Sequence, residues 1–141
     1  MKKIMLIGRS GSGKTSLIQR LNNESLKYKK TQSLIYYRNF LDTPGEYLEN
    51  RRFYSALLVS SFEYDTIIFM QSATDNISVF PPSFANMFNR NIIGVITKID
   101  LPGRNIDYAS EVLRRAGCSL IFNISSVTDE GIDELYGRIN R

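Results

Sequence analysis

The chain has 141 residues, 43% of them hydrophobic and 23% charged, and 18 Lys and Arg against 14 Asp and Glu leave a formal net charge of +4. A chain of this length is expected to fold as one domain spanning residues 1–141. With no histidine and a single cysteine, internal disulfides, Cys/His zinc sites and histidine-dependent catalytic pairs are excluded. No run approaches the roughly 18 apolar residues of a membrane span, so we expect a cytoplasmic protein without a membrane partner.

Basic residues are concentrated in the first part of the chain. Residues 1–60 hold 11 basic and 4 acidic residues, whereas residues 61–141 hold 7 basic and 10 acidic. A positive first half suits an anionic ligand, an acidic partner or nucleic acid, although a solvated basic surface explains it equally well. Because no nucleic-acid recognition motif accompanies the charge, we expect no nucleic-acid partner.

The chain begins with a strand-helix pattern. Apolar residues predict a strand over 4–7, and apolar residues at helical spacing predict a helix over 14–22. Residues 24–33 are polar and basic without clear periodicity and predict a loop. The β-rich pieces 34–37 and 39–41 then predict a short hairpin.

The rest of the chain alternates amphipathic helical patterns with apolar, β-branched runs typical of interior strands. In chain order the expected elements are a helix over 50–62, strand 66–70, a short helix after Pro81-Pro82, strand 92–97, helix 106–116, strand 120–124 and helix 132–139. Such alternation is typical of βαβ units. The predicted fold class is therefore α/β, with three layers: about six mostly parallel strands, helices on both faces, and sites at the carboxyl ends of the strands.

A phosphate-binding motif lies between the first strand and the first helix. Residues 8–15 read GRSGSGKT and match GxxxxGK[ST] in the context that this motif requires. Glycines let the backbone curl so that N–H groups point inward, and the helix N-terminus adds a partial positive charge, which together favour phosphate oxygens. Lys14 is expected to reach the β- and γ-phosphates as a catalytic residue, and Thr15 to ligate Mg²⁺. The other predicted nucleotide-binding residues here are Gly8, Ser10, Gly11, Ser12, Gly13 and Ser16.

Asp42-Thr43-Pro44-Gly45 follows a strand and resembles the DxxG segment of P-loop GTPases. In that superfamily the aspartate binds Mg²⁺ through water and the glycine N–H meets the γ-phosphate. The resemblance therefore implies that Asp42 is a metal residue and Gly45 a sensor of the γ-phosphate. An ordinary β-turn is the alternative interpretation.

Two residues beside this segment complete the predicted catalytic and metal set. Glu46 occupies the position where Ras-like proteins carry the glutamine that orients the attacking water. A carboxylate there adds negative charge beside a triphosphate, which predicts slow or partner-dependent hydrolysis, unless Glu46 is simply an exposed loop residue. Thr31 is the candidate for the threonine that closes over Mg²⁺ in such proteins, with an ordinary loop residue as the alternative.

Thr97-Lys98-Ile99-Asp100 resembles the [NT]KxD motif that recognises guanine. A carboxylate can accept the two adjacent N–H donors of guanine, whereas adenine has no such pair, so Asp100 is the predicted determinant of guanine preference. The alkyl stem of Lys98 is expected to cover the base, with its ammonium turned toward the phosphate loop. Thr97 replaces the commoner asparagine and is expected to lose an amide that braces the pocket.

The segment after the last predicted strand supplies the final candidate residues. Ser125-Ser126 lies where GTPases often have SAK, so the Ser126 N–H could approach the base oxygen, but Val127 supplies no lysine stem. These departures predict moderate affinity for GTP or GDP and leave ATP as an alternative nucleotide.

Taken with the phosphate loop and the TKID segment, the sequences KTQ at 30–32 and DTPGEY at 42–47 resemble the EutP/PduV family over nearly the full chain. The resemblance implies a small Ras-like P-loop NTPase in a bacterial cytoplasm, associated with metabolic microcompartments through a shell protein or a metabolic enzyme. The leading interpretation is a Mg²⁺-dependent nucleotide-binding switch that hydrolyses GTP slowly. The alternatives are an ATP-dependent phosphotransferase acting on a small carboxylate such as acetate, and a non-catalytic nucleotide-binding scaffold. No arginine finger can be assigned, and the candidates are Arg9, Arg38, Arg51, Arg52 or a residue of a partner.

Overall fold

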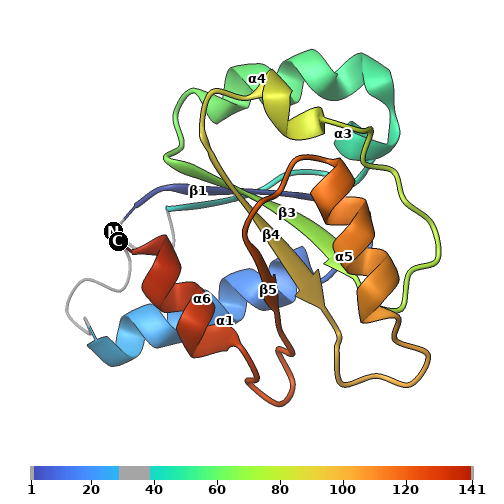
Figure 1. The fold of residues 1–141 in the computed structure, drawn as a ribbon. Coiled ribbons are helices and arrows are strands. Elements are labelled where there is room, and N and C mark those ends of the chain that lie inside the picture. The colour runs from blue at the N-terminus through green and yellow to red at the C-terminus, as the bar shows by residue number, and fades with distance from the viewer. Residues whose placement is uncertain (1, 29–38, 141) are drawn as a thin grey trace.

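The computed structural model describes residues 2–28 and 39–140, and for residues 24–28 it describes the backbone alone. Across these residues five strands form one sheet: β1 (Ile4–Gly8), β2 (Phe40–Asp42), β3 (Thr66–Ser72), β4 (Asn91–Thr97) and β5 (Ile121–Asn123). The strands lie in the order β2-β1-β3-β4-β5, and every neighbouring pair is parallel (Figure 1). The α/β class with a mainly parallel sheet is thus confirmed.

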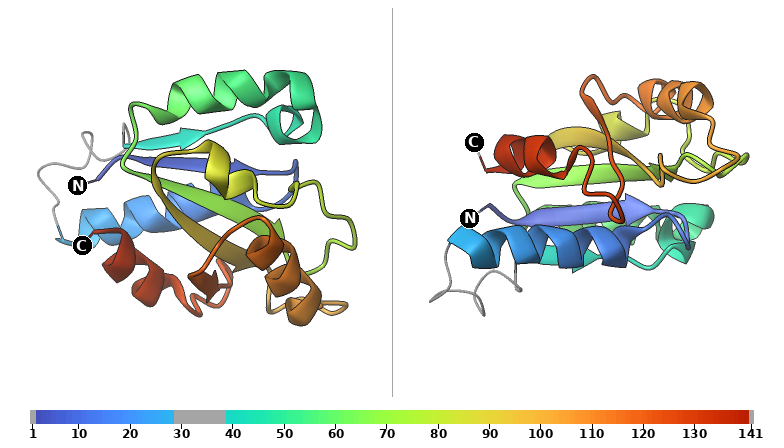
Figure 2. Two further views of the ribbon diagram at one scale, coloured as in Figure 1. Left: turned by 45° about the horizontal axis from the view of Figure 1, so that its top comes forward. Right: turned by 90° about the horizontal axis from the view of Figure 1, so that it is seen from below.

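Helices cover both faces of the sheet (Figure 2). On one face lie α1 (Lys14–Tyr28) and α6 (Ile132–Ile139). The other face carries α3 (Glu46–Glu49), the 3₁₀ turns η2 (Arg51–Phe53) and η3 (Phe84–Met87), α4 (Tyr54–Ser61) and α5 (Ile106–Arg115). No helix in the described ranges is long and apolar enough to cross a membrane.

The strand side chains divide between two hydrophobic cores. In β1, Ile4 and Leu6 pack with α1 and α6, whereas Met5 and Ile7 pack with the helices of the opposite face. All four side chains are fully buried. Because successive strand residues point to opposite faces, a strand covered on both sides needs a continuous apolar run, which is the pattern that the sequence shows.

Two expected elements differ from the structure. The loop predicted from residue 24 is wrong for residues 24–28, because α1 continues through Asn22 and Asn23 to Tyr28. Asparagine costs a helix only a few tenths of a kcal/mol, and the Glu, Leu and Lys that follow are good helix formers. The helix predicted over 50–62 begins as the 3₁₀ turn η2 and continues as α4 to Ser61. The extended Asn50 (φ −128°), whose side chain accepts a hydrogen bond from Arg52 N–H, precedes η2 and separates it from α3.

The strand count also differs from the expected six. The piece predicted over 39–41 corresponds to β2, which pairs in parallel with β1, and the piece over 34–37 lies outside the described residues. The short helix expected after Pro81-Pro82 is the 3₁₀ turn η3. The helices ending the chain match their predicted positions closely, at Ile106–Arg115 and Ile132–Ile139.

The strand order brings the candidate motifs to one edge of the sheet. The chain leaves β1 toward β2 on one side and later returns to β3 on the other, so the order reverses between β1 and β3. Ligands of open α/β sheets bind at such a reversal, beside the carboxyl ends of the strands. Gly8, Asp42 and Thr97 are the last residues of β1, β2 and β4.

Candidate nucleotide-binding site

The phosphate loop joins β1 to α1 and depends on its glycines. Gly11 and Gly13 have φ of +82° and +99°, a left-handed backbone that other residues adopt at a cost. At Gly8 a Cβ atom would lie 2.6 Å from Ser12 Oγ and 3.0 Å from the Met70 carbonyl oxygen, so only hydrogen fits without a shift. The sequence therefore has glycine where the curled backbone and the neighbouring strand require it.

Lys14 is buried inside this loop, with 7% of its surface exposed. Its ammonium donates to the carbonyl oxygens of Gly8 at 2.8 Å and Arg9 at 3.2 Å. Burial lowers the pKa of Lys14, and the carboxylates of Asp42 and Glu49 oppose that shift. The phosphate loop thus holds a desolvated cation whose interaction with an anion is weakly screened by water.

The two predicted metal residues that the structure describes lie in direct contact. Thr15 Oγ1, in the first turn of α1, donates to Asp42 Oδ2 at 2.9 Å, and β2 lies beside β1 with Asp42 opposite Leu6. A hydroxyl and a carboxylate oxygen suit Mg²⁺, which takes one or two protein ligands together with phosphate oxygens and water. No cluster of three or more His, Cys, Asp or Glu suited to a metal occurs in the described residues. Thr31 lies outside these residues.

A cavity of about 470 Å³ opens over the phosphate loop. Gly45 closes one side of it, and a Cβ atom there would lie only 2.3 Å from Ser10 N and 2.4 Å from Ser10 Oγ. The DTPG segment therefore packs directly on the phosphate loop. The lining residues are Ser10, Gly11, Gly13, Lys14, Thr15, Ser16, Asp42, Thr43, Pro44, Gly45 and Lys98.

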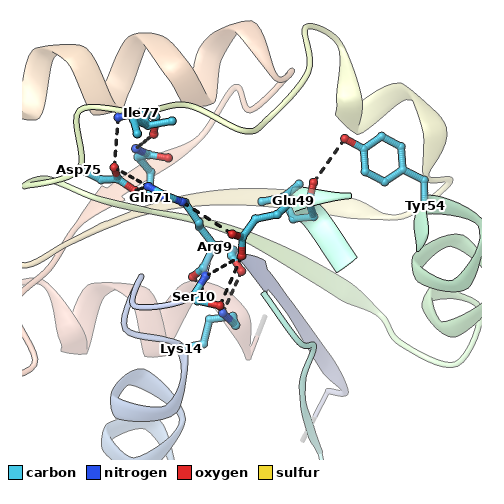
Figure 3. A network of polar contacts seen from close by, with 10 residues as sticks. Arg9, Ser10, Lys14, Glu49, Tyr54, Gln71, Asp75 and Ile77 are labelled. Atoms are coloured by element: carbon cyan, nitrogen blue, oxygen red, sulfur yellow. Dashed lines mark hydrogen bonds and ion pairs between the residues drawn. The ribbon is translucent and has the colours of Figure 1, made fainter. Parts of the chain in front are cut away.

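Glu46 does not line this cavity: it begins α3 and is exposed. The carboxylate that reaches the phosphate loop belongs to Glu49, whose Oε2 accepts from Ser10 Oγ at 3.3 Å and Ser10 N–H at 3.4 Å (Figure 3). Sequence reasoning missed Glu49, because no local signal distinguishes it from other glutamates on a helix.

Arg9, within the phosphate loop, is held between two carboxylates (Figure 3). Its Nη1 donates to both carboxylate oxygens of Asp75 at 2.9 Å, and its Nε lies 4.0 Å from Glu49 Oε1. Of the other arginines considered as fingers, Arg51 and Arg52 are exposed on η2 and do not line the cavity. Arg38 lies outside the described residues.

A second cavity of about 160 Å³ adjoins the first and shares Gly13, Ser16 and Lys98 with it. Lys98 Nζ donates to the Gly11 carbonyl oxygen at 2.6 Å, so its ammonium lies at the phosphate loop. The remaining lining residues are Thr97, Asp100, Leu101, Ser126 and Val127. Sequence reasoning had not singled out Leu101.

Thr97, which lacks the amide of asparagine, braces the phosphate loop through its hydroxyl. Its buried hydroxyl donates to the Ser12 carbonyl oxygen at 2.6 Å, joining the end of β4 to the phosphate loop. The hydroxyl reaches this carbonyl because β4 ends close to the phosphate loop. The two are so close that a Cβ atom added at Gly13 would lie 3.6 Å from the Thr97 side chain.

Asp100 is oriented by Ser125. The Ser125 hydroxyl donates to Asp100 Oδ1 at 2.8 Å and accepts from the N–H groups of Val127 and Thr128 at 3.2 and 3.1 Å. Ser125 is fully buried, whereas Ser126 lines the cavity. Of the two serines, Ser126 faces the cavity and Ser125 positions the carboxylate.

Comparisons with known proteins identify relatives over the full chain. Residues 1–141 match the family profile described as ethanolamine utilisation and propanediol utilisation. Propanediol utilization protein PduV of Citrobacter freundii is 44% identical over 141 residues, 99% of this chain and 94% of that protein. The protein named probable acetate kinase EutP of Salmonella typhimurium is 33% identical over 119 residues, 83% of this chain and 75% of that protein.

Two solved structures share this fold. The G-domain of FeoB from Methanococcus jannaschii has a TM-score of 0.64 at 21% identity, covering 99% of this chain and 95% of that one. Translation elongation factor SelB from Methanococcus maripaludis, in its apo form, has a TM-score of 0.64 at 19% identity, covering 99% of this chain and 32% of that one. These identities show the fold alone. The fold is that of a Ras-like P-loop NTPase, and the full-length family match shows that the chain belongs to the PduV-EutP family of ethanolamine and propanediol utilisation proteins.

Proposed function

We propose that this protein is a Mg²⁺-dependent guanine-nucleotide-binding switch that hydrolyses GTP slowly or only with a partner. The observation that carries the proposal is the pair of adjoining cavities, one over the phosphate loop and one beside Asp100, which share Gly13, Ser16 and Lys98. An elongated ligand with an anionic end and a flat base suits both cavities at once. Family and fold support nucleotide binding in general.

The phosphates of the nucleotide occupy the larger cavity in this proposal. The N–H groups of the phosphate loop and the ammonium of Lys14 bind the β- and γ-phosphates, and Gly45 lies where a terminal phosphate would be sensed. Thr15 and Asp42 would hold the Mg²⁺, which neutralises phosphate charge when bound. Positioning and charge stabilisation supply such catalysis, so histidine is not required.

The base occupies the smaller cavity. Asp100 accepts the adjacent N–H donors of guanine, and Ser125 holds the carboxylate in the orientation that this needs. The apolar side chains of Leu101 and Val127 contact the faces of the base, together with the stem of Lys98.

Slow hydrolysis follows from the residues around the phosphate loop. The exposed Glu46 does not line the cavity, and Arg9 is bound to Asp75 rather than free to contact the nucleotide. A partner that supplies an arginine or repositions Glu46 would accelerate turnover, as arginine fingers do by about 10³–10⁵ in rate. By its family we propose a bacterial cytoplasmic setting with a microcompartment shell protein or a metabolic enzyme as that partner.

Calorimetric titration tests the nucleotide assignment. The protein is titrated with GTP, GDP, ATP and ADP, with and without Mg²⁺, and the series is repeated on Asp100→Ala. We expect guanine nucleotides to bind about tenfold or more tightly than adenine nucleotides, and Asp100→Ala to remove that preference. The matched control is Asp107→Ala, an exposed aspartate that lines neither cavity. Equal or tighter binding of ATP by the wild type would contradict the guanine assignment.

A second candidate function is ATP-dependent phosphoryl transfer to a small carboxylate. It is favoured by the relatives named probable acetate kinase EutP from Salmonella typhimurium and Escherichia coli, 33% and 29% identical. In this reaction a carboxylate oxygen of acetate attacks the γ-phosphorus of ATP, giving acetyl phosphate and ADP. Trapping acetyl phosphate with hydroxylamine distinguishes the two functions: product formed from ATP and acetate supports the transferase. Tight, Mg²⁺-dependent binding with no turnover of either kind supports a scaffold.

A further inference from the structure

The negatively charged carboxylate of Glu49 lies at the edge of the phosphate loop. Both carboxylate oxygens of Glu49 face positively polarised groups, Oε2 the N–H and hydroxyl of Ser10 and Oε1 the Nε of Arg9 (Figure 3). Arg9 is fixed there by Asp75, on the loop after β3, through two contacts of 2.9 Å. The donors that bind Glu49 are thus held in place by the sheet and the phosphate loop.

The Ser10 donors belong to the cavity that receives the phosphates in the proposed function. Ser10 lines that cavity together with Lys14 and Gly45. Glu49 also lies near enough to Lys14 for its charge to oppose the burial-induced lowering of the Lys14 pKa. A terminal phosphate placed among these groups brings additional negative charge to donors that the Glu49 carboxylate already uses.

Glu49 belongs to the same segment as Gly45, which also contacts Ser10. The N–H groups of Leu48 and Glu49 both donate to the Gly45 carbonyl oxygen at 3.1 Å, so α3 continues directly from the DTPG segment. Gly45 in turn packs against Ser10 so closely that a methyl group would not fit. Gly45 and Glu49 thus contact Ser10 from one segment, the first through its backbone and the second through its carboxylate.

We infer that Glu49 is a specificity-determining residue that lowers the affinity for nucleoside triphosphate relative to diphosphate. The terminal phosphate of a triphosphate competes with the Glu49 carboxylate for Ser10 and repels it, whereas a diphosphate leaves the carboxylate in place. Binding of a triphosphate thereby releases α3 from the phosphate loop. The inference rests on the proposed nucleotide site and adds the residue that distinguishes the two nucleotides.

The test compares Glu49 with a glutamate remote from the phosphate loop. Glu49→Gln keeps the shape of the side chain and removes its charge, and Glu63→Gln is the matched control because Glu63 is exposed, follows α4 and lines neither cavity. Dissociation constants are measured in Mg²⁺ for GDP and for a non-hydrolysable GTP analogue, and circular dichroism verifies that each variant is folded. We expect Glu49→Gln to tighten triphosphate binding about tenfold and diphosphate binding less than about threefold, with both constants unchanged in Glu63→Gln.

The outcomes separate this inference from the proposed function. Equal changes for the two nucleotides in Glu49→Gln, or none, overturn the role of Glu49 while nucleotide binding stands. A wild type that binds no nucleotide overturns both. The same selective gain seen with an ATP analogue and ADP, without guanine preference, supports the role of Glu49 and overturns the guanine assignment alone.

Discussion

Thr97→Val tests whether the end of β4 braces the phosphate loop. Valine matches threonine in shape, so the substitution removes the hydroxyl without opening a cavity. The hydrogen bond that is lost joins Thr97 Oγ1 to the Ser12 carbonyl oxygen at 2.6 Å, and both residues are buried, at 4% and 3% exposed. The carbonyl oxygen then loses this donor in a place that water does not readily reach.

The expected loss of stability follows from that burial. Leaving a buried acceptor without its partner costs about 1–3 kcal/mol. For a chain of this size each kcal/mol lowers the melting temperature by about 3–4 °C, so the decrease should be roughly 3–12 °C. Because Ser12 belongs to the phosphate loop, we also expect weaker binding of GTP and GDP alike.

Thermal denaturation followed by circular dichroism measures the stability, and calorimetry measures the affinities. Thr97→Ser is the control, since it retains the hydroxyl, and it should keep most of the affinity for nucleotide. A Thr97→Val protein with the wild-type melting temperature and unchanged affinities would refute the idea that this hydroxyl braces the loop.

Three further predictions follow from single contacts. Gly45→Ala places a Cβ 2.3 Å from Ser10 N and should lower the free energy of unfolding, measured in urea, by about 1–3 kcal/mol. Gly137→Ala is the control and should not destabilise the protein, because a Cβ there meets nothing within 4 Å. Equal effects of the two substitutions would contradict the close packing at Gly45. Asp42→Asn should reduce the gain in nucleotide affinity that Mg²⁺ provides, as titrations with and without the metal would reveal, and an undiminished gain would exclude Asp42 from the metal site. Burial raises the pKa of Cys118 to about 12, so its thiol stays protonated at pH 8 and iodoacetamide should label it only after unfolding; rapid labelling of the folded protein would show that the thiol is accessible.

Local patterns in the sequence were sufficient for the architecture and for the phosphate loop. The apolar runs of β3 and β4 indicate strands buried on both faces, since neither run contains the alternating polar residues of a half-exposed sheet. The eight residues 8–15 are contiguous. The glycines are needed for the curled backbone and the lysine for its positive charge, so the motif can be recognised without knowledge of the fold.

Local patterns were insufficient where a helix boundary depended on weak preferences. Asn22 and Asn23 suggested an end to α1, but the helix continues to Tyr28, and Asn22 is buried within it. The intrinsic cost of asparagine in a helix is small compared with the free energy gained when a helix packs on a sheet. Tertiary packing therefore decides the boundary.

The sequence by itself determined the fold class, the family and the residues of the contiguous motifs, because each of these is recognised from short segments and from their order along the chain. Only the tertiary structure decided which other side chains act on those motifs. Glu49 rather than Glu46 reaches Ser10 across a separation of 39 residues, and Thr97 reaches Ser12 across 85. Such contacts arise because parallel strands bring their carboxyl ends to one edge of the sheet, and no local window of sequence contains both partners.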